Sequence, residues 1–304
     1  MTLAVLCPGQ GAQHGAMLDL ALSDARGRAA LDVATAALGS DPRAWLADDA
    51  MFDNATAQPL ICVAQNAQWS ALSRSLPRPT ALAGYSVGEL SAYGVAGALD
   101  VGLLATLAQA RAAAMDAAAA THRGTLVGLR GLSRRVLAPL CAETGTHIAI
   151  VAADDAFVVG GDAVPLVALT ALAETLGATT RALRVGVAAH TPALASAVEP
   201  FRTALERSAL SRPAVPVIAG IDAAVVTTRE RAIATLAPQV AQTIEWAQCL
   251  DALYERGCRT FLELTPGTAL SRMVRERFDD VQARAADEFR SVRAIAAWAI
   301  RHGG

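Results

Sequence analysis

The sequence predicts a mixed α/β fold in which a small domain is inserted into a large domain built on a parallel sheet. The 304 residues exceed the roughly 150 that form a typical single domain. Short apolar runs of strand length alternate with longer stretches of helical periodicity. The pattern changes near Gly124, where strands and helices follow a different order. We therefore expect a large domain from residues 1–123 and 189–304, and a small domain from residues 124–188.

Apolar runs, and the residues that interrupt them, predict the elements of the large domain. Residues 2–7 have the length of a buried strand, which Pro8-Gly9 ends. The alanine-rich stretch at 99–120 places several leucines and Met115 at helical spacing. On the same grounds the other expected elements are a helix at 59–73, a strand at 80–84, a helix from residue 90, a helix at 192–210, an apolar run at 215–221, helices at 230–240 and 246–256, a strand at 260–264, and closing helices.

The small domain is predicted to alternate strands and helices in a compact pattern. Strands are expected at 125–129, 148–152, 157–159 and 181–187, with helices at 133–144 and 163–176. Strand, helix, strand, strand, helix, strand is the order of a ferredoxin-like domain.

Composition excludes several functional classes. The net charge of −2, from 26 basic and 28 acidic residues, leaves no basic excess for nucleic acid. The chain contains no lysine, which excludes Schiff-base chemistry and a lysine-dependent phosphate loop. Scattered cysteines and histidines lack metal-ligand spacing, so we expect no metal and buried thiols in a reducing compartment. Without a basic leader or an apolar run of about 18 residues, a cytoplasmic protein without membrane attachment is expected.

Gly84-Tyr85-Ser86-Val87-Gly88 fits the G-x-S-x-G pattern of a nucleophile elbow between a strand and a helix. This context favours an α/β-hydrolase-like large domain with Ser86 as the nucleophile. The alternative is an ordinary tight turn in which Ser86 caps the helix. A nucleophilic serine needs a base, and the histidines after Ser86 are His122, His147, His190 and His302. His190 is the best candidate, because it is expected to end a strand among small residues and to precede a helix.

Two further features are compatible with acyl chemistry. The turn Pro8-Gly9-Gln10-Gly11 follows a predicted strand and can present backbone N–H groups to an oxyanion. Arg111 lies in the middle of the alanine-rich helix. In such a helix an arginine normally extends its charged end to solvent.

Together these motifs resemble the malonyl-CoA:acyl-carrier-protein transacylases over nearly the whole chain. The matching stretches, in family order, are Pro8-Gly9-Gln10-Gly11-Ala12-Gln13, Gly84-Tyr85-Ser86-Val87-Gly88-Glu89, Arg111 with Met115, Ala189-His190-Thr191-Pro192, Gln239 with Ile244-Glu245-Trp246, and Glu263-Leu264-Thr265-Pro266-Gly267. Within this family the chain is most similar to the epsilon subunit of malonate decarboxylase, through Gly220-Ile221-Asp222 and Asp287-Glu288-Phe289-Arg290-Ser291.

The resemblance implies a role for each matching residue. Ser86 would carry the malonyl group as an ester, and His190 would act as general base and then general acid. The backbone N–H groups of Gln10 and Val87 would form the oxyanion hole. Arg111 would bind the free malonyl carboxylate.

The resemblance also implies how the histidine is oriented and what the protein binds. A main-chain carbonyl, at the position of Gln239, would orient the histidine. Malonyl-CoA would be the substrate, with no permanently bound cofactor. The acceptor would be a phosphopantetheine-type thiol on an acyl carrier protein or on the malonate decarboxylase carrier subunit. Two departures from the family are Tyr85 in place of histidine and Ala152-Ala153-Asp154 in place of Asn-x-Pro.

Three hypotheses for function remain at this point. The first is malonyl transfer through an acyl-serine, either in malonate decarboxylase or in fatty-acid or polyketide synthesis. The second is a serine esterase or thioesterase, which would require an acid and a late histidine and would leave Arg111 without a role. The third is a scaffold that binds a carrier protein without chemistry.

Overall fold

The computed structural model describes residues 2–47, 49–121, 124–183 and 185–303. In its larger sheet, neighbouring strands pair in parallel except at one edge. There, among the described strands, the last one runs antiparallel to its neighbour. In pairing order the strands are β10 (Gln282–Ala285), β9 (Cys258–Glu263), β1 (Thr2–Cys7), β2 (Ala81–Gly84), β7 (Val217–Ile218) and β8 (Val225–Val226). The predicted parallel core is confirmed.

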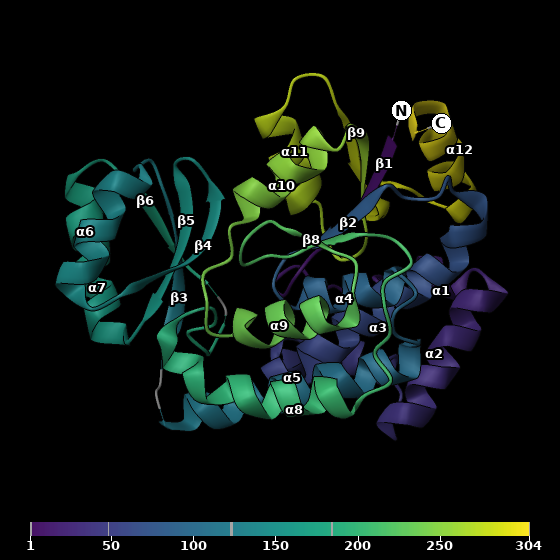
Figure 1. The fold of residues 1–304 in the computed structure, drawn as a ribbon, viewed down its shortest axis with the longest axis horizontal. Helices are drawn as coiled ribbons and strands as arrows, with labels where there is room; N and C mark the ends of the chain where they lie inside the picture. Colours follow the sequence, from purple (N-terminus) through teal and green to yellow (C-terminus); the bar gives the residue numbers. More distant parts are fainter. Residues whose placement is uncertain (1, 48, 122–123, 184, 304) are drawn as a thin grey trace.

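Helices cover both faces of this sheet (Figure 1). One face carries α10 (Trp246–Glu255) and α11 (Ala269–Arg277), whereas α12 (Val292–Gly303) packs against β1 and β9 from the opposite face. On the other side lie α3 (Asn54–Leu72), α4 (Val87–Val95), α5 (Val101–Thr121), α8 (Val198–Arg207) and α9 (Arg229–Gln239), with α1 (Asp19–Leu22) and α2 (Ala25–Leu38) beside them. Short 3₁₀ turns are η1 (Ala44–Ala47), η2 (Asp49–Phe52), η3 (Ser73–Ser75), η4 (Pro192–Ala197) and η5 (Ala286–Glu288). No helix of the described residues is long and apolar enough to span a membrane.

The second sheet is antiparallel and pairs in the order β4 (His147–Ala153), β5 (Ala156–Gly161), β3 (Thr125–Arg130) and β6 (Thr179–Ala182). Its helices are α6 (Arg134–Thr144) and α7 (Ala163–Thr175). Residues such as Val127, Phe157 and Val159 form a separate core under these helices. Leu126, Ile150 and Val158 instead join the core of the larger sheet. The alternation of the strands therefore gives this sheet two buried faces.

Several predicted boundaries were wrong. The strand expected at 181–187 is only β6, because the chain then leaves the sheet and crosses toward the larger one. The helix expected at 192–210 is divided between η4 and α8, with Leu194 at φ −99° and ψ 17°. The apolar run at 215–221 contains the short strand β7. The elements α2, β8 and β10 were not predicted, because their short or alanine-rich sequences give little periodic signal.

Candidate active site

Three loops meet at the carboxyl ends of neighbouring strands. The register pairs Cys7 with Gly84 and Leu6 with Glu263, so β1, β2 and β9 end side by side. The loop containing Gln10 therefore lies next to the turn containing Ser86. The crevice beyond the carboxyl ends of parallel strands is where ligands bind in open α/β sheets.

Ser86 occupies a strained turn between β2 and α4, with φ 58° and ψ −119°. Its neighbours must be small. A Cβ on Gly84 would lie 2.1 Å from the Glu89 nitrogen, and one on Gly88 would lie 2.0 Å from the Cys7 carbonyl oxygen. Both glycines are thus required by close backbone approach, and the predicted elbow is present.

Gly88→Ala is expected to destabilise the protein by at least about 1–3 kcal/mol, because the added methyl group overlaps the backbone of β1. Urea unfolding followed by circular dichroism measures the free energy of unfolding. Gly15→Ala is the matched control, since a Cβ there has no heavy atom within 4 Å. Equal stability of the two variants would contradict the packing argument.

Ser86, His190 and Gln239 form a hydrogen-bonded chain. The Nδ1 of His190 lies 2.6 Å from the main-chain carbonyl oxygen of Gln239. Because a carbonyl only accepts, Nδ1 carries the proton, and Nε2 is left to accept from the Ser86 hydroxyl at 2.7 Å. The sequence suggested that His190 ends a strand, and this prediction was wrong. His190 lies in a turn with φ 63°, and its backbone N–H donates to the Val240 carbonyl at 2.8 Å.

Burial sets the protonation state of the histidine. It lowers the pKa of His190 to about 3, the positive charge of Arg111 acts in the same direction, and the Gln239 carbonyl opposes both. The imidazole is therefore neutral at pH 7 and able to take a proton from Ser86.

Two backbone N–H groups lie near Ser86 with no protein acceptor. In the described part of the chain, neither the Gln10 nor the Val87 N–H donates a hydrogen bond to another protein group. Gln10, Ser86 and His190 line one narrow pocket of about 70 Å³, together with apolar side chains such as Ile150 and Leu183. Free donors in a pocket walled by apolar groups are suited to binding a negatively charged oxygen.

Arg111 is buried, with only 1% of its surface exposed, which excludes the solvent-facing interpretation. Its Nη1 donates to the Gln58 side-chain oxygen at 2.8 Å, and its Nη2 donates to that of Gln239 at 3.0 Å. Among the described residues no carboxylate lies within ion-pair distance, and burial lowers its pKa to about 10. Arg111 does not itself line the pocket, but lies behind it as a buried cation held by neutral amides.

Glu89 and Gln58 belong to the site, although no sequence pattern gave them a role. Glu89 is fully buried on α4, where its Oε2 accepts from the Gln239 side chain at 2.6 Å and from the Gly220 N–H at 2.9 Å. Burial raises the pKa of Glu89 to about 7. Glu89 follows the elbow directly, so its position in the motif was the available signal.

Gln58 belongs to a row of buried glutamines on α3 that hydrogen-bond to the loops of the site and to Arg111. Gln65 donates to the Pro8 carbonyl at 2.8 Å, and the Gln68 oxygen accepts from the Thr265 N–H at 3.0 Å. These contacts fix the loops after β1 and β9, while Gln58 holds Arg111. Buried amides within an apolar helix are the signal that could have identified this row.

A wider groove of about 490 Å³ continues from the Ser86 pocket, with which it shares Tyr85, Val158 and Leu183. Its walls include Arg130, Arg181, Arg272 and the alanines Ala152 and Ala153. Tyr85 packs edge-on against Trp246, with ring centroids 5.3 Å apart. Both departures from the family pattern therefore lie along this groove.

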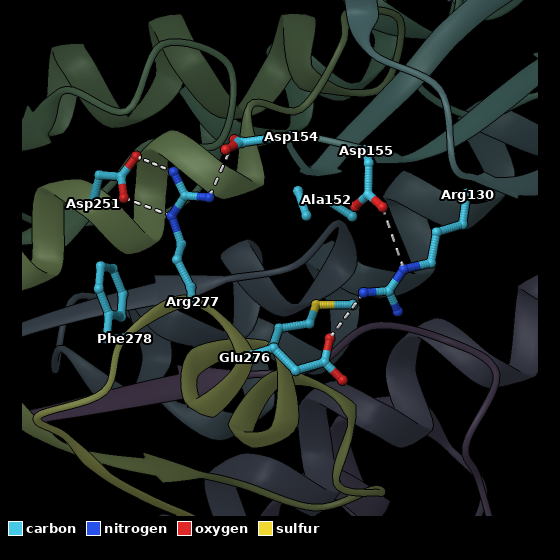
Figure 2. Close-up of a pocket in the computed structure, with 10 residues that line it drawn as sticks. Arg130, Ala152, Asp154, Asp155, Asp251, Glu276, Arg277 and Phe278 are labelled. Atoms are coloured by element: carbon cyan, nitrogen blue, oxygen red, sulfur yellow. Dashed lines mark hydrogen bonds and ion pairs between the residues drawn. The ribbon is translucent and has the colours of Figure 1, made fainter.

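Ion pairs beside the groove connect the β4–β5 turn to α10 and α11 (Figure 2). Arg277 binds both oxygens of Asp251 at 2.6 Å and approaches Asp154 at 3.3 Å. Arg130 lies between Asp155 and Glu276, at 3.7 and 3.5 Å. These pairs brace the smaller sheet against the larger one and line a cavity of about 400 Å³ that adjoins the groove.

The remaining histidines are not brought to Ser86. His147 is exposed at the start of β4, and His302 lies near the end of α12. His122 falls outside the described residues. The five cysteines are buried and free, as predicted.

The profile of the family described as acyl transferase domain matches residues 5–299. The chain belongs to this family. As an acyltransferase it is 32% identical over 302 residues to the malonyl CoA-acyl carrier protein transacylase of Mycobacterium bovis, covering 93% of this chain and 95% of the relative. Among solved structures, FabD from Acinetobacter baumannii has a TM-score of 0.93 and 26% identity, with 99% and 98% coverage. MCAT from Mycobacterium tuberculosis has a TM-score of 0.89 and 29% identity, with 97% and 100% coverage.

Proposed function

We propose that this acyltransferase moves malonyl groups from malonyl-CoA to the thiol of an acyl carrier protein. The observation that carries the proposal is Arg111, a buried cation that pairs with no carboxylate of the described residues and lies beside a serine and a neutral histidine. A buried guanidinium bound only to amides favours an anionic ligand, because an anion offsets more of its desolvation cost. An acyl group that ends in a carboxylate meets this requirement, and the transacylase relatives act on malonyl-CoA by name.

In the first half-reaction Ser86 Oγ attacks the thioester carbonyl while its proton passes to Nε2 of His190. The Gln10 and Val87 N–H groups stabilise the oxyanion. The C–S bond then breaks, the proton from Nε2 goes to the departing CoA thiol, and malonyl remains as an ester on Ser86. Gln239 holds the imidazole in the required tautomer through its main-chain carbonyl.

In the second half-reaction the phosphopantetheine thiol of the carrier enters by the same groove. Nε2 of His190 takes the thiol proton, the sulfur attacks the ester, and Ser86 Oγ recovers the proton as it leaves. Arg111 holds the malonyl carboxylate throughout by giving up an amide contact. No step requires a resident cofactor or metal.

Incubation with malonyl-CoA is expected to add one malonyl mass to the peptide containing Ser86. Mass spectrometry of an acid-quenched digest measures this adduct, and acetyl-CoA provides the comparison. An active preparation that transfers malonyl without forming the adduct would overturn the covalent mechanism. Rapid hydrolysis of neutral esters would instead favour the esterase hypothesis, and carrier binding without any transfer would favour a scaffold.

Arg181→Glu is expected to raise the KM for malonyl-CoA or carrier about tenfold with little change in kcat. Arg181 lines the groove and is exposed, and none of the described carboxylates pairs with it. Its charge is thus free for phosphate or an acidic carrier surface. Steady-state kinetics at low and high salt measure the effect, with Arg207→Glu on α8 as the control outside the groove. The same KM shift in both variants would refute a local role for Arg181.

The finer assignments belong to the same proposal. We propose a ferredoxin-like small domain at residues 124–188 within an α/β-hydrolase-like large domain. The two segments that suggested the epsilon subunit of malonate decarboxylase make contacts within the fold. The Gly220 N–H donates to Glu89, and the Asp287 carboxylate contacts His14 and the Gly267 N–H. These contacts do not depend on the decarboxylase. Stand-alone transacylase activity is the better-supported reading. Assays with a fatty-acid carrier and with the decarboxylase carrier distinguish the two.

A further inference from the structure

The orientation of the Gln239 side chain is decided by its neighbours. Its oxygen faces Arg111, and its NH₂ group faces the Glu89 carboxyl at 2.6 Å and the Ser86 carbonyl at 3.2 Å. A guanidinium only donates, so a flipped amide would place two donors against each other. The orientation seen is the one in which the three contacts all join a donor to an acceptor.

Glu89 is itself held in a fixed position. It lies in the first turn of α4, three residues after Ser86, and its Oε2 accepts a second hydrogen bond from the Gly220 N–H. A Cβ at Gly220 would lie 2.7 Å from this oxygen, so the approach requires glycine. The other carboxyl oxygen is buried with no partner among the described residues.

We propose that Glu89 is a positioning residue that locks the Gln239 amide, so that its carbonyl oxygen holds Arg111 ready for the substrate carboxylate. The inference rests on the proposed malonyl transfer. Gln239 links the two halves of the site, because its side chain binds Arg111 while its main chain binds His190. Loss of the Glu89 acceptor leaves the amide free to turn and Arg111 without a fixed oxygen. The main-chain carbonyl stays in place at the end of α9, so His190 is affected less.

Glu89→Leu is expected to lower kcat/KM for malonyl-CoA about tenfold or more, and that for acetyl-CoA by less than about threefold. Glu89→Gln keeps an acceptor oxygen and is expected to restore most of the malonyl-to-acetyl ratio. Gly220→Ala, which pushes the carboxyl group away without removing it, is expected to shift the ratio in the same direction as Glu89→Leu. Thermal unfolding of each variant identifies the folded preparations. If Glu89→Leu does not fold, a folded Gly220→Ala still tests the inference, because it is expected to shift the ratio in the same direction.

A double-mutant cycle with Gln239→Leu tests whether Glu89 acts through Gln239. If it does, Glu89→Leu produces no further loss of the ratio in that background. Equal losses for malonyl and acetyl transfer, or additive effects in the cycle, would overturn the inference. A wild-type enzyme that forms no malonyl-Ser86 would instead overturn the proposed function, so the two failures are distinguishable.

Discussion

Ser86→Ala is expected to lower malonyl transfer by about 10⁴- to 10⁶-fold, because the hydroxyl is the atom that forms the ester. His190→Ala should cause a loss of similar size, since Nε2 accepts the hydroxyl proton across a 2.7 Å hydrogen bond. The two residues act in one step, so the double variant should be no slower than either single variant. Transfer of labelled malonyl from CoA to carrier, followed over hours, measures these rates.

The control for Ser86→Ala is Ser75→Ala, which removes an exposed hydroxyl outside the active site and should leave transfer unchanged. Folding is checked by thermal unfolding, where Ser86→Ala is not expected to lose stability. If Ser86→Ala kept more than a few per cent of wild-type activity, another nucleophile would have to carry the acyl group. If the double variant were much slower than either single variant, His190 would be acting independently of Ser86.

The parts of the site that the sequence could predict are encoded locally. The elbow was identifiable because Gly84 and Gly88 must lie against backbone on either side of Ser86, and this requirement has a fixed spacing. The adjacency of Gln10 and Ser86 follows from two short strands that pair in parallel. His190 was selected by comparison with the other histidines, but its setting was predicted wrongly. Its position depends on a carbonyl from α9, which no local pattern encodes.

The parts that were missed depend on contacts between distant elements. Glu89, Gln239 and Arg111 meet from α4, α9 and α5, and Gln58 joins them from α3. Arg111 and Gln239 were named from the family resemblance, whereas Glu89 and Gln58 were not. Both are fully buried polar residues on helices, so a general search for such residues would have identified them as candidates. Their pairing could not be predicted, because it follows from helix packing. The short edge strands β8 and β10 were missed for the same reason, since their pairing partners define them more than their sequences do.

Arg111→Ala is expected to lower kcat/KM for malonyl-CoA by about 10²- to 10³-fold, a loss of about 3–4 kcal/mol in the transition state. Acetyl transfer should change by less than about threefold, because acetyl has no carboxylate for the guanidinium to hold. The physical reason is the buried setting: Arg111 is 1% exposed, so a malonyl carboxylate left without it would be desolvated and unpaired. Competition between malonyl-CoA and acetyl-CoA, followed by the mass of the Ser86 adduct, measures the ratio directly.

Arg111→Lys separates charge from geometry. A lysine keeps the positive charge but cannot donate to Gln58, Gln239 and a carboxylate through a planar fork, so an intermediate malonyl-to-acetyl ratio is expected. A ratio equal to that of the wild type would mean that charge alone selects the substrate. Equal loss of malonyl and acetyl transfer in Arg111→Ala would mean that the guanidinium supports the fold of α3, α5 and α9 and does not bind the substrate. Because the two substrates differ only in the carboxylate, their ratio reports on that contact and cancels any change in the fraction of folded enzyme.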